Sequence, residues 1–216
     1  MNVSDFIKVN RIKGAVFDMD GTLTDSMARW GEIYAVLSEY IKTELPQGFM
    51  MKVNHIPMRG RIKEIKCQFL LDFDENKVYS YWVSKAAEYY EKVFKIKPYM
   101  LGTLKELSAL GVKCGIATAS DKVCAEAFIK SNNLQEYFDG ITGLDEVSRP
   151  KSFPDIYIKA ADKLGLQPSE CIVFEDALTA IKAAKSGGFK VCGVQDDCSA
   201  KDSREIIAVS DLNLGF

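Results

Sequence analysis

The sequence predicts an α/β fold with a doubly wound, Rossmann-like parallel sheet core and an inserted α-helical domain. Two observations lead to this prediction. Short, continuously apolar runs alternate with segments of helical spacing, as in a parallel sheet that helices cover on both faces. The stretch 26–96 contains no good strand and interrupts that alternation directly after the first apolar run.

Four apolar runs predict the strands of the core, at 12–17, 112–118, 171–174 and 189–194. Helical spacing of apolar residues predicts the helices between them, at 101–110, 121–131, 154–164 and 177–186. Because parallel strands are joined by right-handed crossovers, their carboxyl ends should all lie at one edge of the sheet. The predicted core covers residues 1–24 and 97–216.

The inserted segment, residues 25–96, is expected to form a small helical bundle. Its first helix is predicted by apolar side chains three or four residues apart: Met27, Trp30, Tyr34, Leu37 and Ile41. Pro46 and Gly48 mark a turn, and two further helices are expected at about 61–71 and 74–93. The aromatic residues of the last helix, Tyr81, Trp82, Tyr89 and Tyr90, are expected to belong to the apolar core, with the lining of a substrate pocket as the alternative.

The composition is that of an ordinary globular protein, with 47% hydrophobic residues, 27% charged residues and a net charge of −2. The charge offers no basic stripe for nucleic acid or a membrane surface. No apolar run reaches the ~20 residues that span a bilayer, and residues 1–13 lack the apolar centre of a signal peptide. We therefore expect a cytoplasmic protein with no nucleic-acid or membrane partner.

The cysteines and the histidine exclude other kinds of site. None of the six cysteines forms a C-x-x-C pair, so they are expected to be reduced, and the three inside apolar runs to be buried. The single histidine, His55, argues against a zinc site or a Ser-His-Asp triad, because either would depend on it alone.

The most informative segment is DMDGTLTD at 18–25, which follows the first apolar run. It puts two carboxylates, Asp18 and Asp20, one residue apart where a buried strand ends and the chain turns at Gly21. Like charges this close raise each other's pKa or require a cation between them. Asp25 precedes a helical pattern and is expected to cap that helix.

Three further fragments follow predicted strands or precede a helix at the same sheet edge. Thr118 ends the second strand and is followed by Ala119; Lys151 lies in a loop before a helix; Glu175 and Asp176 end the third strand. Carboxylates suit a hard divalent cation, whereas ammonium, hydroxyl and backbone N–H groups suit a phosphoryl group. This set of groups fits Mg²⁺-assisted phosphoryl transfer.

These motifs, in this order, resemble those of the haloacid dehalogenase superfamily. The family pattern is D-x-D-G-T-L-x-D-S, a strand ending in Thr, a Lys three residues before Pro-Asp, and Glu-Asp after a strand. The resemblance covers about 11–194. The helical insertion is similar to the α-helical cap of the β-phosphoglucomutase and phosphoglycolate phosphatase branch.

The resemblance implies a catalytic role for each matching residue. Asp18 is implied as the nucleophile that forms an aspartyl-phosphate, and Asp20 as the general acid and then the general base. Thr118 and the N–H of Ala119 are implied to bind the phosphoryl oxygens, and Lys151 to neutralise charge on the nucleophile and the phosphate.

The resemblance also implies a cofactor, Mg²⁺. Its implied ligands are the carboxylate of Asp18, the backbone carbonyl of Asp20 and the carboxylate of Asp176. Glu175 is expected nearby, as a ligand or through a water molecule. A cation is needed because a carboxylate does not attack a dianionic phosphate unless the repulsion is cancelled.

Two residues indicate which reaction within the family this chain is expected to catalyse. The dehalogenase and phosphonatase branches lack an aspartate two residues after the nucleophile, so Asp20 favours phosphate esters. Trp30 stands where β-phosphoglucomutase-like sequences have a histidine, which favours a phosphatase over a mutase. Ser152 and Ala180 stand where the family often has proline and glycine, and both are expected to be tolerated.

We therefore expect a Mg²⁺-dependent phosphatase that hydrolyses a small phosphorylated metabolite, such as a sugar phosphate, as a monomer or weak homodimer. The alternatives are a phosphosugar mutase and a non-catalytic phosphate-binding module on the same scaffold. Arg59, Gly60 and Arg61 in the cap are candidates for substrate specificity, with a solvated surface loop as the alternative. Ser120 is expected to contact phosphate, or Ser120-Asp121 to cap the next helix. The sequence does not identify the substrate.

Overall fold

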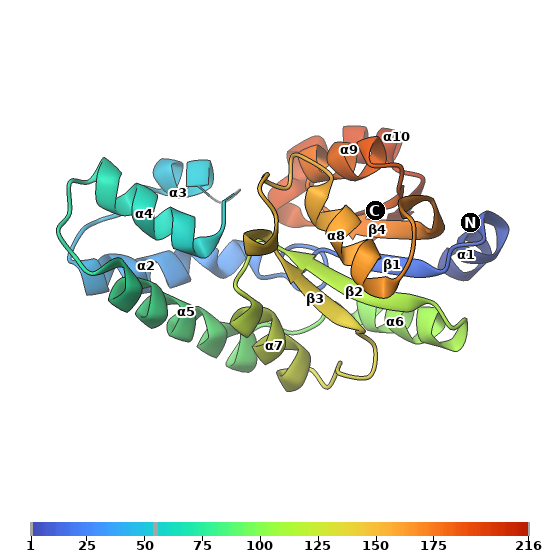
Figure 1. The fold of residues 1–216 in the computed structure, drawn as a ribbon, viewed down its shortest axis with the longest axis horizontal. Helices are drawn as coiled ribbons and strands as arrows, with labels where there is room; N and C mark the ends of the chain where they lie inside the picture. Colours follow the sequence, from blue (N-terminus) through green and yellow to red (C-terminus); the bar gives the residue numbers. More distant parts are fainter. Residues whose placement is uncertain (1, 54–55, 216) are drawn as a thin grey trace.

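The computed structural model describes residues 2–53 and 56–215 and contains a six-stranded parallel sheet (Figure 1). The strand order is β3-β2-β1-β4-β5-β6. The strands are β1 Gly14–Phe17, β2 Lys113–Thr118, β3 Gly140–Gly143, β4 Cys171–Glu175, β5 Lys190–Val194 and β6 Leu212–Leu214. The predicted doubly wound α/β fold is confirmed.

Alternate residues of each strand face opposite sides of the sheet and enter two separate apolar clusters. In β1, Ala15 and Phe17 belong to one cluster and Val16 to the other. The first cluster is covered by α1 Val3–Asn10, α6 Pro98–Ala109 and α7 Lys122–Ser131. The second is covered by α8 Asp155–Leu164, α9 Leu178–Ser186 and α10 Ser203–Val209. Burial on both faces explains why β1 and β4 are apolar up to Glu175, the last residue of β4.

All four predicted strands are present, and their ends agree within two residues. The edge strands β3 and β6 were not predicted, because β3 has only four residues, two of them glycine, and β6 has three. The helix α1 was also missed, although its buried Val3, Phe6 and Ile7 have the spacing of an amphipathic helix.

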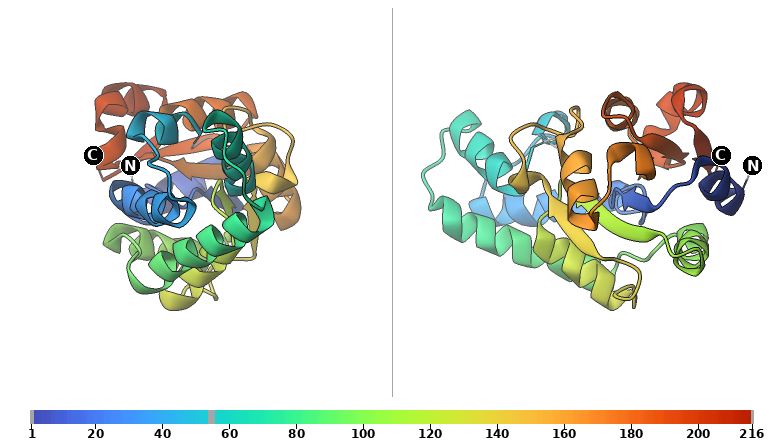
Figure 2. Two further views of the ribbon diagram at one scale, coloured as in Figure 1. Left: turned by 90° about the vertical axis from the view of Figure 1, so that its left-hand side faces the viewer. Right: turned by 45° about the vertical axis from the view of Figure 1, so that its right-hand side comes forward.

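Four helices follow β1, and we call them the cap helices. They are α2 Trp30–Ile41, α3 Gln47–Val53, α4 Met58–Gln68 and α5 Glu75–Lys92. Figures 1 and 2 show them at one end of the molecule, opposite α1. The helix expected at 61–71 begins earlier, after Pro57, and ends at Gln68, because Leu70 has a left-handed backbone (φ 52°).

The longest cap helix packs against the sheet domain. Helix α5 lies beside α7 (Figure 1). Tyr90 of α5 and Phe94, which follows the helix, belong to the same apolar cluster as Phe128 and Ile129 of α7. The cap helices and one face of the sheet therefore share a continuous apolar contact.

The two chain segments that join the cap helices to the sheet run next to each other. Thr24 and Ile96 form an antiparallel bridge, and the N–H of Lys97 donates to the carbonyl of Leu23 (2.8 Å). The boundaries that the sequence predicts, at 25 and 97, lie beside this bridge and stay a prediction.

The side chain of Lys97 is buried and fastens this connection. Its ammonium donates to the carbonyl oxygens of Gly21 (2.6 Å) and Gln195 (2.9 Å). It also forms ion pairs with Asp25 (3.0 Å) and Asp196 (3.3 Å). One ammonium thus ties together the turn after β1, the start of α6 and the loop after β5.

This arrangement corrects one prediction. Asp25 does not cap the following helix; it pairs with Lys97, and Ser26 precedes the 3₁₀ turn Met27–Arg29 without a capping side chain. Burial lowers the pKa of Lys97, but its carboxylate neighbours outweigh burial, and the net pKa is raised. Lys97 therefore stays charged at neutral pH.

We predict that Lys97→Met destabilises the protein by ~3–5 kcal/mol, because it leaves the buried carboxylate of Asp196 without its ammonium. Urea unfolding measures the change. Lys95→Met is the matched control, since Lys95 is exposed two residues away and should change the free energy of unfolding by less than ~0.5 kcal/mol. Equal stability of the two variants would refute the role of Lys97.

Candidate active site

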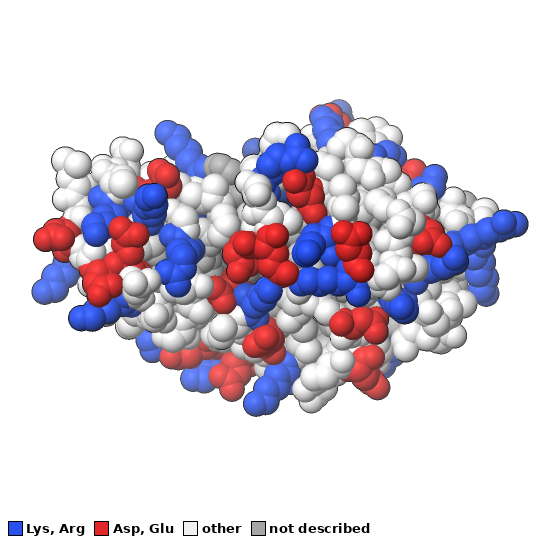
Figure 3. Space-filling model, in the orientation of Figure 1, with Lys and Arg blue, Asp and Glu red and all other residues white. Residues whose placement is uncertain are grey.

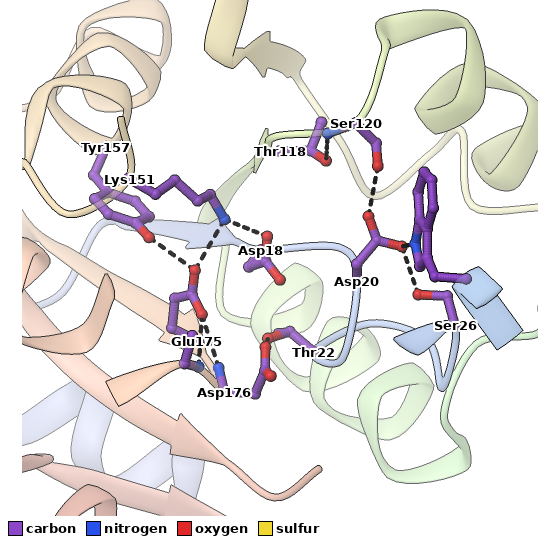
Figure 4. A network of polar contacts seen from close by, with 12 residues as sticks. Asp18, Asp20, Thr22, Ser26, Thr118, Ser120, Lys151, Tyr157, Glu175 and Asp176 are labelled. Atoms are coloured by element: carbon purple, nitrogen blue, oxygen red, sulfur yellow. Dashed lines mark hydrogen bonds and ion pairs between the residues drawn. The ribbon is translucent and has the colours of Figure 1, made fainter. Parts of the chain in front are cut away.

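Three buried carboxylates gather at the carboxyl edge of the sheet, between its two central strands. Asp18 follows β1, and Glu175 and Asp176 lie at the end of β4. The strands are paired with Phe17 opposite Phe174, so the register alone places Asp18 beside Glu175. One oxygen from each of the three carboxylates lies within 4.8 Å of the others. Figure 4 shows the group.

A single ammonium enters this group. Lys151, from the loop before α8, forms an ion pair with Asp18 and another with Glu175 (2.9 Å). Burial lowers the pKa of Lys151, but the two carboxylates outweigh it and raise the pKa overall. The lysine therefore remains a cation beside Asp18.

Glu175 is saturated with hydrogen bonds. One carboxylate oxygen accepts from Lys151 and from the hydroxyl of Tyr157 (2.8 Å). The other accepts from the backbone N–H groups of Asp176 (2.9 Å) and Ala177 (3.0 Å). Glu175 thus orients Lys151, and its expected role as a metal ligand, direct or through water, stays a prediction. Tyr157 was missed because nothing local in the sequence distinguishes its hydroxyl from that of other core tyrosines.

Three carboxylates face one ammonium, and the pKa values of Asp18 and Asp176 are raised. Burial raises the pKa of Asp18 to about 8; Glu175 and Asp20 add to the shift and Lys151 opposes it. Burial, with Glu175 and Asp18, raises the pKa of Asp176 well above its ordinary value. The carboxylates offer oxygen ligands and carry excess negative charge. A hard divalent cation bound to them would reduce the repulsion between them. The residues therefore fit a divalent metal ion.

The turn after Asp20 packs directly on Asp176. Gly21 has φ +90°, and a Cβ atom there would lie 2.6 Å from the Oδ2 of Asp176. The hydroxyl of Thr22 donates to the Oδ1 of Asp176 (3.1 Å). The glycine is therefore required twice, by its backbone conformation and by the approach of the carboxylate.

The carboxylate of Asp20 turns away from this group (Figure 4). It accepts hydrogen bonds from the side chains of Ser26 (2.5 Å), Trp30 (3.2 Å), Ser120 (2.7 Å) and Tyr90. Two of these donors, Trp30 and Tyr90, belong to cap helices. The sequence predicted Tyr90 as a core residue, with a substrate-pocket position as the alternative; it is buried, and its hydroxyl reaches Asp20.

The strand β2 ends near the acidic cluster and near Asp20. The hydroxyl of Thr118 accepts the N–H of Ser120 (3.0 Å), which shapes the turn that follows. Asp121, not Ser120, caps α7, by accepting the N–H of Val123. Ala119 and Ser120 face the same cavity as Asp18.

The acidic cluster and the carboxylate of Asp20 with its donors border one cavity of about 250 Å³. Its walls come from the sheet edge and from the cap helices. The lining residues are Asp18, Asp20, Met27, Trp30, Arg61, Ala119, Ser120, Lys151, Ser152, Glu175, Asp176, Ala177, Thr179 and Ala180. A cavity lined by carboxylates, an ammonium and aromatic and apolar side chains can hold a small polar ligand.

Of the three candidate specificity residues, Arg61 is the one that borders this cavity. It is buried, donates to the carbonyl of Ile56 (2.8 Å), and lies 5.6 Å from the ring centroid of Trp30. Arg59 instead stacks on Tyr79 (4.0 Å), and neither it nor Gly60 is among the described residues that line the cavity. His55 lies outside the described residues.

A doubly wound sheet with titratable groups gathered at its carboxyl edge, facing a cavity, is the organisation of an α/β enzyme. The sequence matches the family model of haloacid dehalogenase-like hydrolases over residues 15–194, and the chain belongs to this family. The family and the hydrolase class predicted from the motifs are confirmed.

Known relatives span nearly the same length. Fructose-1-phosphate phosphatase YqaB of Escherichia coli is 25% identical over 193 residues, which cover 86% of this chain and 97% of the relative. The phosphorylated carbohydrates phosphatase of Thermotoga maritima is 23% identical over 183 residues, 83% of each chain. The phosphate complex of CbbY from Rhodobacter sphaeroides has the same fold, with a TM-score of 0.80 at 19% identity over 94% of this chain and 93% of CbbY.

The surface carries both signs of charge. On the face drawn in Figure 3, lysine and arginine side chains are interspersed with aspartate and glutamate. Among the helices of the described chain, none is long and apolar enough to cross a membrane.

We predict that Asp18→Asn raises the melting temperature of the metal-free protein at pH 8. Asp18 binds a proton up to about pH 8 in the folded state, but only up to about 3.8 when unfolded. The folded protein therefore binds more protons, and its free energy of unfolding falls as the pH rises from about 4 to about 8. Asparagine removes this penalty, and Lys151 keeps its ion pair with Glu175. A rise of several °C is expected, since 1 kcal/mol shifts the melting temperature by ~2–4 °C at this size.

Differential scanning calorimetry in EDTA, at pH 5 and pH 8, measures the effect. The gain should be larger at pH 8 than at pH 5. Asp162→Asn, on the exposed side of α8, is the control and should show no such pH-dependent gain. A lower melting temperature for Asp18→Asn at pH 8 would contradict the burial penalty.

Proposed function

We propose that this protein is a Mg²⁺-dependent phosphatase that hydrolyses a sugar phosphate or a similar small phosphorylated metabolite through an aspartyl-phosphate on Asp18. One observation carries the proposal. Asp18 lines the cavity, forms an ion pair with Lys151, and has a carboxylate oxygen within 4.8 Å of one from Asp176.

Each catalytic residue has a defined task in this proposal. The Oδ atom of Asp18 attacks phosphorus, and the bond to the ester oxygen breaks. Lys151, held by Glu175, offsets the charge of the nucleophile and the phosphate. Backbone N–H groups after β2, that of Ala119 first, donate to the phosphoryl oxygens, and Thr118 shapes the turn that presents them.

The metal ion would be held by the carboxylates of Asp18 and Asp176 and the backbone carbonyl of Asp20. When bound, it supplies the positive charge that reduces repulsion between the nucleophile and the phosphate dianion. Glu175 acts on this site through Lys151, because its four hydrogen bonds occupy both carboxylate oxygens.

Proton transfer is assigned to Asp20. In the first step its protonated carboxyl gives a proton to the departing ester oxygen, so the product leaves as an alcohol. In the second step its carboxylate takes a proton from the water that attacks the aspartyl-phosphate, which releases inorganic phosphate and restores Asp18. Its carboxylate is separate from the acidic cluster, which suits a group that must change its proton rather than coordinate a cation.

The substrate class is proposed from the cavity and the relatives together. Both relatives named above act, by their names, on phosphorylated carbohydrates. The cavity has polar groups at the sheet edge and Met27, Trp30 and Arg61 on the cap side, where a sugar or polyol would lie. The indole of Trp30 donates to Asp20 and cannot take up a proton as a histidine can, which disfavours the mutase alternative.

We predict turnover of p-nitrophenyl phosphate that requires added Mg²⁺ and is abolished by EDTA. Asp18→Asn should lose at least ~10³-fold in kcat, because asparagine is a poor nucleophile and a weaker metal ligand. Asp162→Asn, the exposed control, should keep the activity of the parent. Activity that survives both EDTA and Asp18→Asn would refute the mechanism.

A panel of phosphorylated metabolites, ranked by kcat/KM, tests the substrate class. Hexose and hexitol phosphates should rank above nucleotides and phosphoglycolate. Conversion of β-glucose 1-phosphate to glucose 6-phosphate, primed by the bisphosphate, would instead support a mutase. Calorimetric binding of phosphoesters without turnover would support a non-catalytic module. The cytoplasmic location and the monomeric or weakly dimeric state stay predictions.

A further inference from the structure

The hydroxyl of Tyr90 occupies a special position among the donors to Asp20. It contacts the Oδ1 of Asp20 and lies 3.1 Å from the Oγ of Ser120. The Oγ of Ser120 in turn donates to the Oδ2 of Asp20 (2.7 Å). The three side chains close a triangle that engages both oxygens of the carboxylate, and so fixes the rotation of its plane.

Tyr90 is well suited to hold such a position. It is fully buried, and its ring packs edge-on against Phe94, with 4.9 Å between the ring centroids, and against Trp30, with 6.4 Å. Its backbone carbonyl accepts a hydrogen bond from Ser131 of α7 (3.0 Å), which fastens this part of α5 to the sheet domain. The hydroxyl lies within hydrogen-bonding reach of both Asp20 and Ser120 and, like an ordinary tyrosine hydroxyl at neutral pH, it carries a proton to donate.

We propose that Tyr90 is a positioning residue for the reaction: together with Ser120 it fixes the direction of the Asp20 carboxylate at the cavity. This inference rests on the proposed function, in which Asp20 transfers the proton. It assigns a role in that step to a cap residue that need not touch the substrate, because in the described chain Tyr90 is not among the residues lining the cavity.

The consequence of losing the hydroxyl follows from the geometry. The χ2 torsion of an aspartate is broad, so a carboxylate that loses a donor can swing. Without the Tyr90 hydroxyl, Ser26 and Trp30 still donate to Oδ1 and Ser120 to Oδ2, but the contact between the hydroxyls of Tyr90 and Ser120, which keeps Ser120 in place, is lost. A displacement of about 1 Å at a reacting group costs up to ~10²-fold in rate.

The test is Tyr90→Phe, with Tyr89→Phe as the matched control. Tyr89 is the next residue on α5, and its hydroxyl faces Glu32 instead of Asp20. Equal melting temperatures of the two variants, within a few °C, establish that Tyr90→Phe folds. Ser120→Ala, which removes the other corner of the triangle, provides a second variant if Tyr90→Phe does not fold.

The kinetic readout separates positioning from a general loss of structure. An alcohol leaving group needs a proton from Asp20, whereas p-nitrophenolate does not. We expect kcat/KM for the best sugar phosphate of the panel to fall ~10–10²-fold in Tyr90→Phe, with KM little changed and p-nitrophenyl phosphate affected less than ~3-fold. In an Asp20→Asn background, Tyr90→Phe should have no further effect. An equal loss with both substrates, or additive losses in the double variant, overturns the proposal.

A crystal structure of Tyr90→Phe supplies a readout that does not depend on activity. The carboxylate of Asp20 should rotate away from the Oγ of Ser120, and an unchanged contact near 2.7 Å overturns the proposal. The proposed function fails separately: the parent protein would then turn over neither p-nitrophenyl phosphate nor any sugar phosphate. An active parent with an unaffected Tyr90→Phe variant refutes only the role of Tyr90.

Discussion

The constraint on which the structure depends is the burial of three carboxylates beside one ammonium at the carboxyl edge of the sheet. The pairing of β1 with β4 brings Asp18 and Glu175 together, and no rearrangement of side chains could separate them. The surrounding structure accommodates the charge: Tyr157 and two backbone N–H groups satisfy Glu175, Lys151 bridges two carboxylates, and a glycine leaves room for Asp176. The charge that remains is what a metal ion would balance.

The same turn separates two aspartates into different environments. Asp18 faces Lys151 and the acidic cluster, where its charged form is costly without a cation. Asp20, two residues later, faces hydroxyl groups and an indole N–H that come from four different parts of the chain. Two chemically identical side chains thereby acquire different proposed tasks, nucleophile and proton carrier, because environment rather than residue type decides what a carboxyl group can do.

The cap helices contribute to the different environments of Asp18 and Asp20. Lys97 fastens the segments that join them to the sheet, and α5 shares an apolar cluster with α7. Through Trp30 and Tyr90 they also reach the carboxylate of Asp20. The cavity is therefore bounded on one side by the titratable side chains of the sheet edge and on the other by side chains of the cap. Among those cap side chains, Arg61 is the charged one.

The sequence by itself determined the four inner strands of the sheet, the presence of cap helices, the family, and the carboxylates and the lysine that meet at the sheet edge. Apolar runs and short motifs are local signals, and parallel topology brings the ends of such strands together. Only the tertiary structure decided that Asp25 pairs with Lys97, that Glu175 is saturated, and that Arg61 rather than Arg59 borders the cavity. Those outcomes depend on which side chains from distant parts of the chain point at each other, and spacing along one segment does not record that direction.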